Sequence, residues 1–344
     1  MDKTGPTLVV NGAFRPQRIT GQQRYATEVA NRLVESGAAI EVAPPEALSR
    51  SALRTWAWVQ TLAIGNKGLP LLSLTSRAPI VRSKHCVVIH DLFVITNPEW
   101  FSRKYVATHA PLLRAHIRSA AVRFAVSPST RDRVRDLFGL DSIVAPNAPG
   151  NQFFRDDGLD LSALEKRGLT PGSYLLTVGS LDPRKNYDRL LAAFASLPKD
   201  LQRQFPLVVV GGAANAFAKT RLESDGTVVL AGYVDDPTLS TLYRYAKGVV
   251  FPSLDEGFGL PAVEGLAAGA RLVVSDIPVF RWVCGTNALF FDPLDVQSIA
   301  FGLLSAITSG EPKQSDTENR KQAARKFSWD QTAGLIREGV QSVA

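Results

Sequence analysis

The chain has 344 residues, of which 45% are hydrophobic and 21% are charged. This length exceeds what one hydrophobic core organises, so two domains are expected, and the composition excludes a disordered or fibrous protein. The two cysteines, Cys86 and Cys284, lie in or beside apolar runs, which excludes a disulfide framework and favours buried thiols. No apolar run approaches the ~20 residues of a membrane span, and residues 1–6 lack signal-peptide features. We therefore expect a soluble, cytoplasmic protein.

The excess positive charge lies in the first part of the chain. The net charge is +7, but residues 1–150 carry +9 and residues 151–344 carry −2. Three interpretations of the basic half stay open: a nucleic-acid surface, an anionic membrane or diphosphate-bearing acceptor, and a plain solvated surface. Because the sequence has no nucleic-acid-binding motif, we expect no nucleic-acid partner and prefer a membrane surface to nucleic acid.

Short β-branched runs alternate with helical patterns along the whole chain. In the first half the expected strands are residues 7–10, 86–90, 122–126 and 142–145, and the expected helices are 24–36, 103–120 and 129–138. In the second half the expected strands are 174–178, 206–210, 227–230, 249–251 and 271–274, and the expected helices are 188–196, 237–246 and 261–268. The alternation predicts an α/β protein with two parallel, doubly wound sheets, joined by a polar linker over residues 146–170.

Glycine and acidic residues follow several expected strands of the second half. Gly179 and Ser180 follow one strand, Gly211 and Gly212 follow the next, and Glu256 follows another. A single glycine at such a position is common in the turn between a strand and a helix. The coincidence across one sheet predicts a ligand site at the carboxyl ends of its strands and in the crevice between the domains.

Residues 251–264, F-P-S-L-D-E-G-F-G-L-P-A-V-E, are the most informative segment. A strand ends at Phe251, a glycine-containing loop follows, and Pro261 stands where the first turn of a helix begins. The first backbone N–H groups and the helix dipole would then form an anion-binding site suited to a diphosphate. These N–H groups belong to Phe258, Gly259 and Leu260.

Two carboxylates bracket this loop. Glu256 lies before it and Glu264 lies in the first turns of the expected helix. Carboxylates beside a phosphate site bind hydroxyl donors, which a ribose and a sugar both supply. The alternative is an acidic helix cap and a surface glutamate.

This segment resembles the retaining glycosyltransferases of family 4, which have the GT-B fold and two glutamates separated by seven residues around E-G-F-G-L-P. The resemblance continues in residues 232–243, G-Y-V-D-D-P-T-L-S-T-L-Y, and in residues 273–276, V-V-S-D. It implies that Glu264 holds the ribose hydroxyls of a nucleotide-sugar donor and that Glu256 contacts hydroxyls of the transferred sugar. Val234 is assigned to donor binding as well.

A second matching segment, residues 176–186 or L-T-V-G-S-L-D-P-R-K-N, places two cations after a strand. Arg184 and Lys185 can stabilise a leaving diphosphate, and since no metal-ligand cluster is visible, neither a metal nor another cofactor is expected. The resemblance implies that Lys185 contacts the diphosphate. It also implies that Arg184 replaces an arginine that many members place at Ser180, directly after Gly179. The alternative is an exposed basic pair that caps a loop.

Two further matches lie in the first half. Residues 20–25, T-G-Q-Q-R-Y, partly resemble the family's glycine loop under the donor phosphates, which assigns Gly21 to donor binding, with a turn and helix cap as the alternative. Residues 87–92, V-V-I-H-D-L, deliver a histidine and an aspartate at the end of a strand. The resemblance places His90 at the donor sugar and the reacting centre, whereas a core histidine is the alternative. Asp91 is assigned to the local backbone or the acceptor.

The resemblance also implies a domain organisation. Residues 1–155, with a C-terminal helix at 328–344 that crosses back, would form an acceptor-binding domain, and residues 156–327 would form the nucleotide-sugar-binding domain. The start of that terminal helix is similar to residues 327–331, F-S-W-D-Q. One departure from the family is Trp282, which stands where members commonly have a glutamate.

The implied function is transfer of a hexose from a nucleotide diphosphate sugar to a glycan or lipid-linked saccharide, as in bacterial mannosyl- and rhamnosyltransferases of surface polysaccharide assembly. Mannose from GDP-mannose is slightly preferred. No carboxylate pair favours double displacement, so a metal-independent same-face displacement is expected, in the cytoplasm or peripherally on the inner membrane. A phosphorylase, a nucleotide-sugar epimerase and a non-catalytic nucleotide-sugar-binding protein remain as alternatives.

Overall fold

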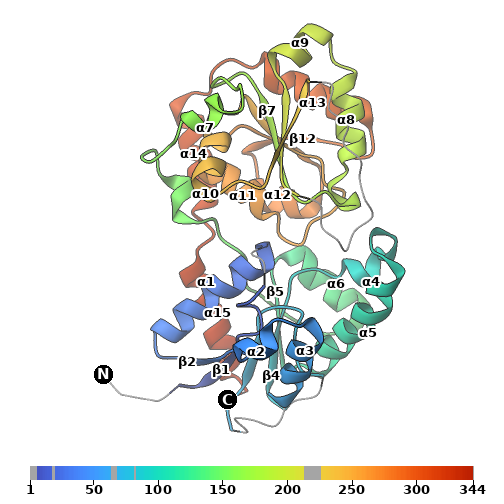
Figure 1. Cartoon of the computed structure of the whole chain (residues 1–344), viewed down its shortest axis with the longest axis vertical. Coiled ribbons are helices and arrows are strands. Elements are labelled where there is room, and N and C mark those ends of the chain that lie inside the picture. Colours follow the sequence, from blue (N-terminus) through green and yellow to red (C-terminus); the bar gives the residue numbers. More distant parts are fainter. Residues whose placement is uncertain (1–5, 18–19, 63–67, 81–82, 213–225, 344) are drawn as a thin grey trace. The chain divides into compact units, whose positions relative to one another are not determined.

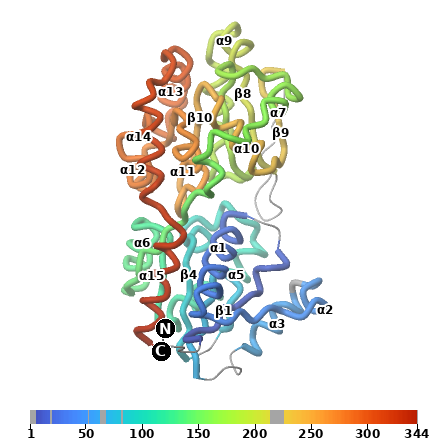
Figure 2. The backbone as a smooth tube through the Cα atoms, turned by 90° about the vertical axis from the view of Figure 1, so that its left-hand side faces the viewer, coloured from blue at the N-terminus to red at the C-terminus, as the bar shows by residue number. Residues whose placement is uncertain are grey.

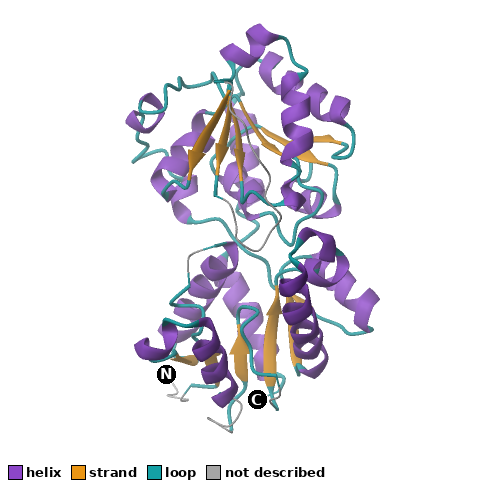
Figure 3. Cartoon of the chain, turned by 45° about the vertical axis from the view of Figure 1, so that its right-hand side comes forward, coloured by secondary structure: helices purple, strands orange, loops and turns teal. Residues whose placement is uncertain are grey.

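The computed structural model describes residues 6–17, 20–62, 68–80, 83–212 and 226–343. The chain divides into two compact units, each built on one six-stranded parallel sheet (Figure 1). Unit 1 comprises Met1–Pro98, Arg103–Asn147 and Phe327–Ala344, and unit 2 comprises Glu99–Ser102 and Ala148–Lys326. Helices lie on both faces of each sheet (Figure 3), so the predicted pair of doubly wound α/β sheets is confirmed.

The sheet of unit 1 has the strand order β2-β1-β3-β4-β5-β6. Its strands are β1 (Leu8–Asn11), β2 (Ala39–Val42), β3 (Leu71–Ser73), β4 (His85–Ile89), β5 (Val122–Ala125) and β6 (Ile143–Val144). Its helices are α1 (Gly21–Glu35), α2 (Glu46–Ser49), α3 (Ala52–Thr61), α4 (Phe93–Thr96), α5 (Arg103–Ser119), α6 (Pro128–Phe138) and α15 (Trp329–Gln341). The 3-10 turn η1 (Pro98–Trp100) lies where the chain passes from unit 1 into a short segment of unit 2. The strands β2 and β3 were not expected, since β2 is a partly exposed edge strand and β3 has only three residues, so neither forms a clear apolar run.

The C-terminal helix α15 belongs to unit 1 and packs against α1 (Figure 2). Trp329 meets the ring of Tyr25 edge-on at 5.6 Å between centroids, and Thr332 Oγ1 donates to the carbonyl oxygen of Pro146 at 2.6 Å. Ile336 and Val340 are fully buried on the same helix. These contacts confirm that the terminal helix returns to the first domain.

The sheet of unit 2 has the order β12-β11-β10-β7-β8-β9. Its strands are β7 (Leu175–Val178), β8 (Leu207–Val210), β9 (Val228–Gly232), β10 (Gly248–Phe251), β11 (Leu272–Ser275) and β12 (Ala288–Phe291). Its helices are α7 (Ser162–Glu165), α8 (Tyr187–Ala195), α9 (Lys199–Gln204), α10 (Asp236–Tyr245), α11 (Leu260–Ala267), α12 (Pro278–Cys284), α13 (Val296–Thr308) and α14 (Gln314–Ala324), with 3-10 turns η2 (Asn151–Phe154) and η3 (Pro183–Lys185). The central strands β7, β8, β10 and β11 are buried throughout, as expected for strands covered on both faces.

The order of unit 2 creates a switch point between β7 and β10. From β7 the chain adds β8 and β9 on one side, and it then returns to place β10 on the other side. The loops that leave β7 and β10 therefore begin side by side at the carboxyl ends of these strands, which is where ligands bind in open α/β sheets.

The predicted linker over residues 146–170 is only partly correct. This segment contains η2 and α7, and nearly all of it belongs to unit 2. Phe153 is fully buried and meets the ring of Tyr243 edge-on at 5.9 Å, and Leu164 is buried as well. A small number of apolar residues thus attach this polar segment to the core of unit 2. Because they are isolated in the sequence, they produce no hydrophobic periodicity from which a helix or strand could be predicted.

Two further expectations concern thiols and membranes. Cys86 and Cys284 are both free and buried, and burial raises the pKa of each thiol to about 12. Among the described helices, none is long and apolar enough to cross a bilayer.

Candidate active site

The loops after β7 and β10 are bonded to each other at the switch point of unit 2. The backbone N–H of Leu254 donates to the carbonyl oxygen of Arg184 at 2.8 Å. Asn186 has a left-handed backbone with φ of 57°, and its side-chain amide donates to the carbonyl oxygens of Pro252 at 3.0 Å and Pro293 at 2.8 Å. Asparagine tolerates this conformation better than most residues. The two loops are thus held in one arrangement.

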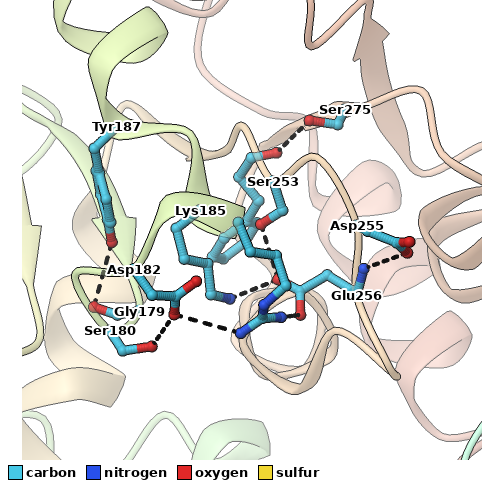
Figure 4. A network of polar contacts seen from close by, with 11 residues as sticks. Gly179, Ser180, Asp182, Lys185, Tyr187, Ser253, Asp255, Glu256 and Ser275 are labelled. Atoms are coloured by element: carbon cyan, nitrogen blue, oxygen red, sulfur yellow. Dashed lines mark hydrogen bonds and ion pairs between the residues drawn. The ribbon is translucent and has the colours of Figure 1, made fainter. Parts of the chain in front are cut away.

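Glu256 lies at the centre of a charged network between these loops (Figure 4). Lys185 Nζ donates to its Oε1 at 2.5 Å, and Arg184 Nη1 donates to its Oε2 at 2.5 Å. Ser253 Oγ also donates to Oε1, at 2.8 Å. The side chains of Glu256, Lys185 and Arg184 are only 7%, 9% and 16% exposed, so the predicted alternative of an exposed basic pair is wrong.

The electrostatics of this network keep Glu256 ionised. Burial acts to raise the pKa of Glu256, but the charges of Arg184 and Lys185 and the hydrogen bonds from Lys185 and Ser253 outweigh it and lower the pKa to about 2. A buried carboxylate is tolerated because both of its oxygens accept charged hydrogen bonds. The carboxylate of Glu256 therefore fixes the positions of two cations at the switch point.

A second carboxylate, that of Asp182 (labelled in Figure 4), also contacts Arg184. Its Oδ2 is 3.5 Å from Arg184 Nη2 and accepts a hydrogen bond from Ser180 Oγ at 2.6 Å. Asp182 is fully buried, and its Oδ1 has no hydrogen-bond partner in the part of the chain that the structure describes. The guanidinium of Arg184 is thus positioned by two carboxylates, and Ser180 contributes to this through Asp182.

Gly179 leaves room for the lysine. A Cβ atom at this position would lie 3.1 Å from Cε of Lys185, which is tighter than ordinary packing. Its carbonyl oxygen accepts a hydrogen bond from Tyr187 Oη at 3.3 Å. Gly211, with φ of 139°, packs even more tightly against Gly179, because a Cβ atom at position 211 would lie 1.9 Å from the carbonyl oxygen of Gly179. The glycines after β7 and β8 therefore have a packing role beside the site.

The loop after β10 ends in a helix whose N-terminus faces the carboxyl edge of the sheet. Gly259 is the N-cap of α11 with φ of 83°, and a Cβ atom there would lie 2.8 Å from Phe280 Cε1. Leu260 and Pro261 form the first turn. Phe258 is buried, and its ring is met edge-on by Trp282 at 5.9 Å. The first N–H groups of a helix lack intrahelical acceptors, so this end is suited to an anion.

Glu264 is carried by α11 and faces inward. It is 5% exposed, and Tyr243 Oη donates to its Oε2 at 3.4 Å. The alternative of a surface glutamate is therefore wrong. Val234 is also buried and lies just after β9, between that strand and α10. Asp235 Oδ1 accepts from the backbone N–H of Thr238 at 3.0 Å and caps α10.

The candidate residues of unit 1 lie at the carboxyl edge of the other sheet. His90 directly follows β4 and is half-buried, and its Nε2 contacts the carbonyl oxygen of Leu74 at 2.9 Å. Burial lowers the pKa of His90 to about 4, although the Leu74 contact acts in the opposite direction. The ring is therefore neutral at neutral pH, and because a carbonyl only accepts, Nε2 carries the proton and Nδ1 is an acceptor. Asp91 Oδ1 accepts from the N–H of Phe93 at 3.2 Å, and Gly21 is an exposed residue that opens α1.

Arg184, Lys185 and Glu256 are thus in direct contact, and Ser180 is joined to them through Asp182. The sequence interpretation did not assign Asp182 or Ser253, although both lie inside the motifs quoted for the site. Among the described residues, no group of three or more His, Cys, Asp or Glu side chains is arranged to hold a metal ion.

Comparison with known proteins places this site in a family. Residues 165–327 match the family described as Glycosyl transferases group 1. The chain is 30% identical over 250 residues to O-antigen chain mannosyltransferase B of Escherichia coli, an alignment that covers 70% of this chain and 66% of the relative. It is 28% identical over 274 residues to the serotype-specific mannosyltransferase WbdA of Escherichia coli, which covers 74% of this chain but 33% of that protein.

The fold has close counterparts among solved structures. Sucrose-phosphate synthase from Thermosynechococcus elongatus superposes with a TM-score of 0.73 over 99% of this chain and 100% of that one, at 16% identity. Such a low identity shows a shared fold and no more. Residues 165–327 are therefore a Glycosyl transferases group 1 domain, and the two parallel sheets give the chain the GT-B fold.

Proposed function

We propose that this chain is a retaining glycosyltransferase that transfers a hexose from a nucleotide diphosphate sugar to a glycan or a lipid-linked saccharide. The observation that carries the proposal is the contact of Arg184 and Lys185 with Glu256 at the switch point of unit 2. Two buried cations beside a helix N-terminus suit a diphosphate, and carboxylates suit sugar hydroxyls. The mannosyltransferase relatives support the same reaction class.

We assign the donor to the residues around this network. The diphosphate is bound by Arg184, Lys185 and the first N–H groups of α11, those of Phe258, Gly259 and Leu260. Glu264 accepts hydrogen bonds from the ribose hydroxyls, and Glu256 accepts them from the transferred sugar. Gly179, Ser180 and Val234 complete the donor site of unit 2. In unit 1 we assign Gly21 to the donor phosphates and His90, through its Nδ1 acceptor, to a hydroxyl of the sugar.

The mechanism follows from the charges of these residues. As the glycosyl bond breaks, negative charge grows on the leaving diphosphate, and Arg184 and Lys185 stabilise it without a metal. The acceptor hydroxyl attacks from the same face and gives its proton to the departing diphosphate oxygen. Glu256 is a poor nucleophile for double displacement, because both of its oxygens are engaged by cations. Configuration at the anomeric carbon is then retained.

The donor proposal can be tested by turnover of individual nucleotide sugars. GDP-mannose is our first choice, since the names of the relatives specify mannose, and UDP-glucose is the comparison. The purified chain should release GDP in the presence of excess EDTA and an acceptor glycan, and proton NMR of the product should show the donor's anomeric configuration. Strict dependence on inorganic phosphate would indicate a phosphorylase instead. Donor binding without turnover on any acceptor would indicate a binding protein, and a metal requirement would refute the metal-free mechanism.

Glu264→Ala should weaken nucleotide binding about ten- to a hundredfold. The substitution removes the acceptor for the ribose hydroxyls, and hydrogen bonds to charged groups contribute about 1.5–3 kcal/mol. Titration calorimetry with GDP measures the effect, and Glu165→Ala, an exposed position on α7, is the matched control. A folded Glu264→Ala protein that binds GDP as tightly as the parent would contradict this assignment.

We further propose that unit 1 docks on an anionic membrane surface. Helix α3 exposes Leu53 (73%) and Trp56 (39%) together with the cation Arg54, whereas Trp58 packs partly against the core. Exposed aromatic and aliphatic side chains beside arginine suit the headgroup region of a bilayer. Among the cations of residues 50–84, Lys67 and Arg82 lie outside the described residues.

Vesicle sedimentation tests this docking. Binding should rise with the fraction of anionic lipid and fall sharply with salt, since each basic residue near the surface contributes about 1 kcal/mol within a Debye length. Trp56→Ser should weaken the binding, and Leu335→Ser, at an exposed apolar position of α15, should leave it unchanged. Failure to bind anionic vesicles even at low ionic strength would mean that the acceptor is soluble.

A further inference from the structure

Unit 2 contains a cavity at the amino-terminal edge of its sheet, opposite to the candidate active site. The cavity has a volume of about 310 Å³, and the charged residues of its lining are Arg244, Lys247, Arg271 and Glu311. Lys247 directly precedes β10 and Arg271 directly precedes β11, whereas Glu256 follows the other end of β10. Since the strands are parallel, the two sites lie at opposite edges of one sheet. The volume is within the range of small-molecule sites.

The lining of this amino-edge cavity is cationic. Arg244, Lys247 and Arg271 line it, and Glu311 is the single carboxylate in its lining. Of the three cations, Arg271 is used by the fold: it donates to the carbonyl oxygens of Lys247 at 3.4 Å, Ala306 at 3.3 Å and Gly310 at 2.6 Å. Arg244 and Lys247 make no such bonds to main-chain carbonyls within the described ranges. Helix packing therefore does not account for these two cations.

In the ion pairs of Arg244 and Lys247, the cation is nearly buried and the carboxylate is largely exposed to solvent. The cations are 17% and 14% exposed, whereas their partners Asp156 and Glu311 are 69% and 88% exposed. The Lys247–Glu311 pair is long, at 3.9 Å, and Asp156 is shared with a third cation, Lys321, at 3.2 Å. A nearly buried charge is costly unless a well-placed opposite charge compensates it, and exposed carboxylates compensate weakly. Burial accordingly lowers the pKa of Arg244.

The position of Arg244 at the end of a helix explains only part of the positive charge in this cavity. Arg244 lies in the last turn of α10, where the helix dipole favours a cation. This effect falls off within one turn and does not require a hollow beside the side chain. An anion inside the cavity would be met by both cations, since both belong to its lining.

We propose that the amino-edge cavity binds the phosphate group of a small molecule, either free phosphate or a phosphate monoester. Arg244 supplies a planar fork that matches two phosphate oxygens, and Lys247 supplies a point charge. The site is distinct from the donor site, and it requires nothing of the proposed transferase activity.

Titration calorimetry of the full chain with inorganic phosphate, at constant ionic strength, tests this site. Lys247→Met, which keeps the aliphatic stem, should lower the affinity about tenfold or more, and Arg244→Gln should do the same. The matched control Lys199→Met, at an exposed position of α9, should leave the affinity unchanged. In the Lys185→Met background, which lacks a cation of the proposed donor site, phosphate should still bind and Lys247→Met should cause the same loss, which separates this cavity from the candidate active site.

A parallel titration with glucose 6-phosphate distinguishes the two sources of the phosphate group. Tighter binding than inorganic phosphate identifies a monoester as the ligand, and equal or weaker binding identifies free phosphate. The inference is overturned if neither compound binds, if Lys247→Met and Arg244→Gln both bind phosphate like the parent, or if Lys185→Met abolishes the binding.

Discussion

Lys185→Met should lower kcat about 100-fold or more and change donor affinity far less. The ammonium of Lys185 lies at the switch point of unit 2, 2.5 Å from Glu256 Oε1, where the leaving diphosphate is proposed to gain charge. An interaction that strengthens in the transition state lowers the barrier more than it tightens ground-state binding, and loss of one such donor costs about 10²–10³ in rate. Methionine keeps most of the unbranched apolar stem and removes the ammonium group, with its charge and its hydrogen-bond donors.

Steady-state kinetics with the best donor and calorimetry with its nucleotide diphosphate measure the two effects separately. Lys166→Met, an exposed lysine of unit 2, is the matched control and should behave like the parent. A Lys185→Met protein that turns over at the parental rate would remove Lys185 from the catalytic residues. A loss confined to donor affinity would reduce it to a binding residue.

Glu256→Ala should destabilise unit 2 by about 3 kcal/mol and abolish most activity. The substitution leaves Arg184 and Lys185 without the carboxylate that both contact, and breaking a buried ion pair from one side costs about 3–5 kcal/mol. We expect the lower end, because Arg184 is 16% exposed and also lies near Asp182. Urea unfolding at neutral pH measures the loss, with Glu318→Ala on α14 as an exposed control.

The same carboxylate gives the stability a defined pH dependence. The pKa of Glu256 is lowered from 4.5 to about 2 in the folded chain, so the unfolded chain takes up this proton first as the pH falls. Its contribution is fully present above about pH 4.5 and is lost as the pH falls towards 2. The difference in unfolding free energy between the parent and Glu256→Gln should therefore shrink across this window. A difference that stays constant from pH 6 to pH 3 would show that the charge of Glu256 does not stabilise the fold.

The sequence by itself predicted the α/β fold class and the central strands, and it placed the candidate site residues in two short motifs. Strands such as β7 and β8 are continuous apolar runs, and α11 begins with Pro261, so local patterns and turn chemistry were enough to place them within one or two residues. The motifs around Lys185 and Glu256 were likewise visible, because each lies within about a dozen consecutive residues. Short edge elements such as β2 were missed, since four half-exposed residues carry no period.

The tertiary structure decided which of these residues meet. Lys185 and Glu256 are 71 positions apart, and only the order β10-β7 in the sheet brings their loops together. The same packing turns Glu264 inward and places the buried carboxylate of Asp182 beside Arg184. None of this could be predicted from spacing, because strand order and side-chain burial depend on contacts between segments far apart in the chain. Local sequence patterns indicate which backbone conformation a segment prefers. Which charged side chains form pairs is decided only when the strands have assembled into the sheet.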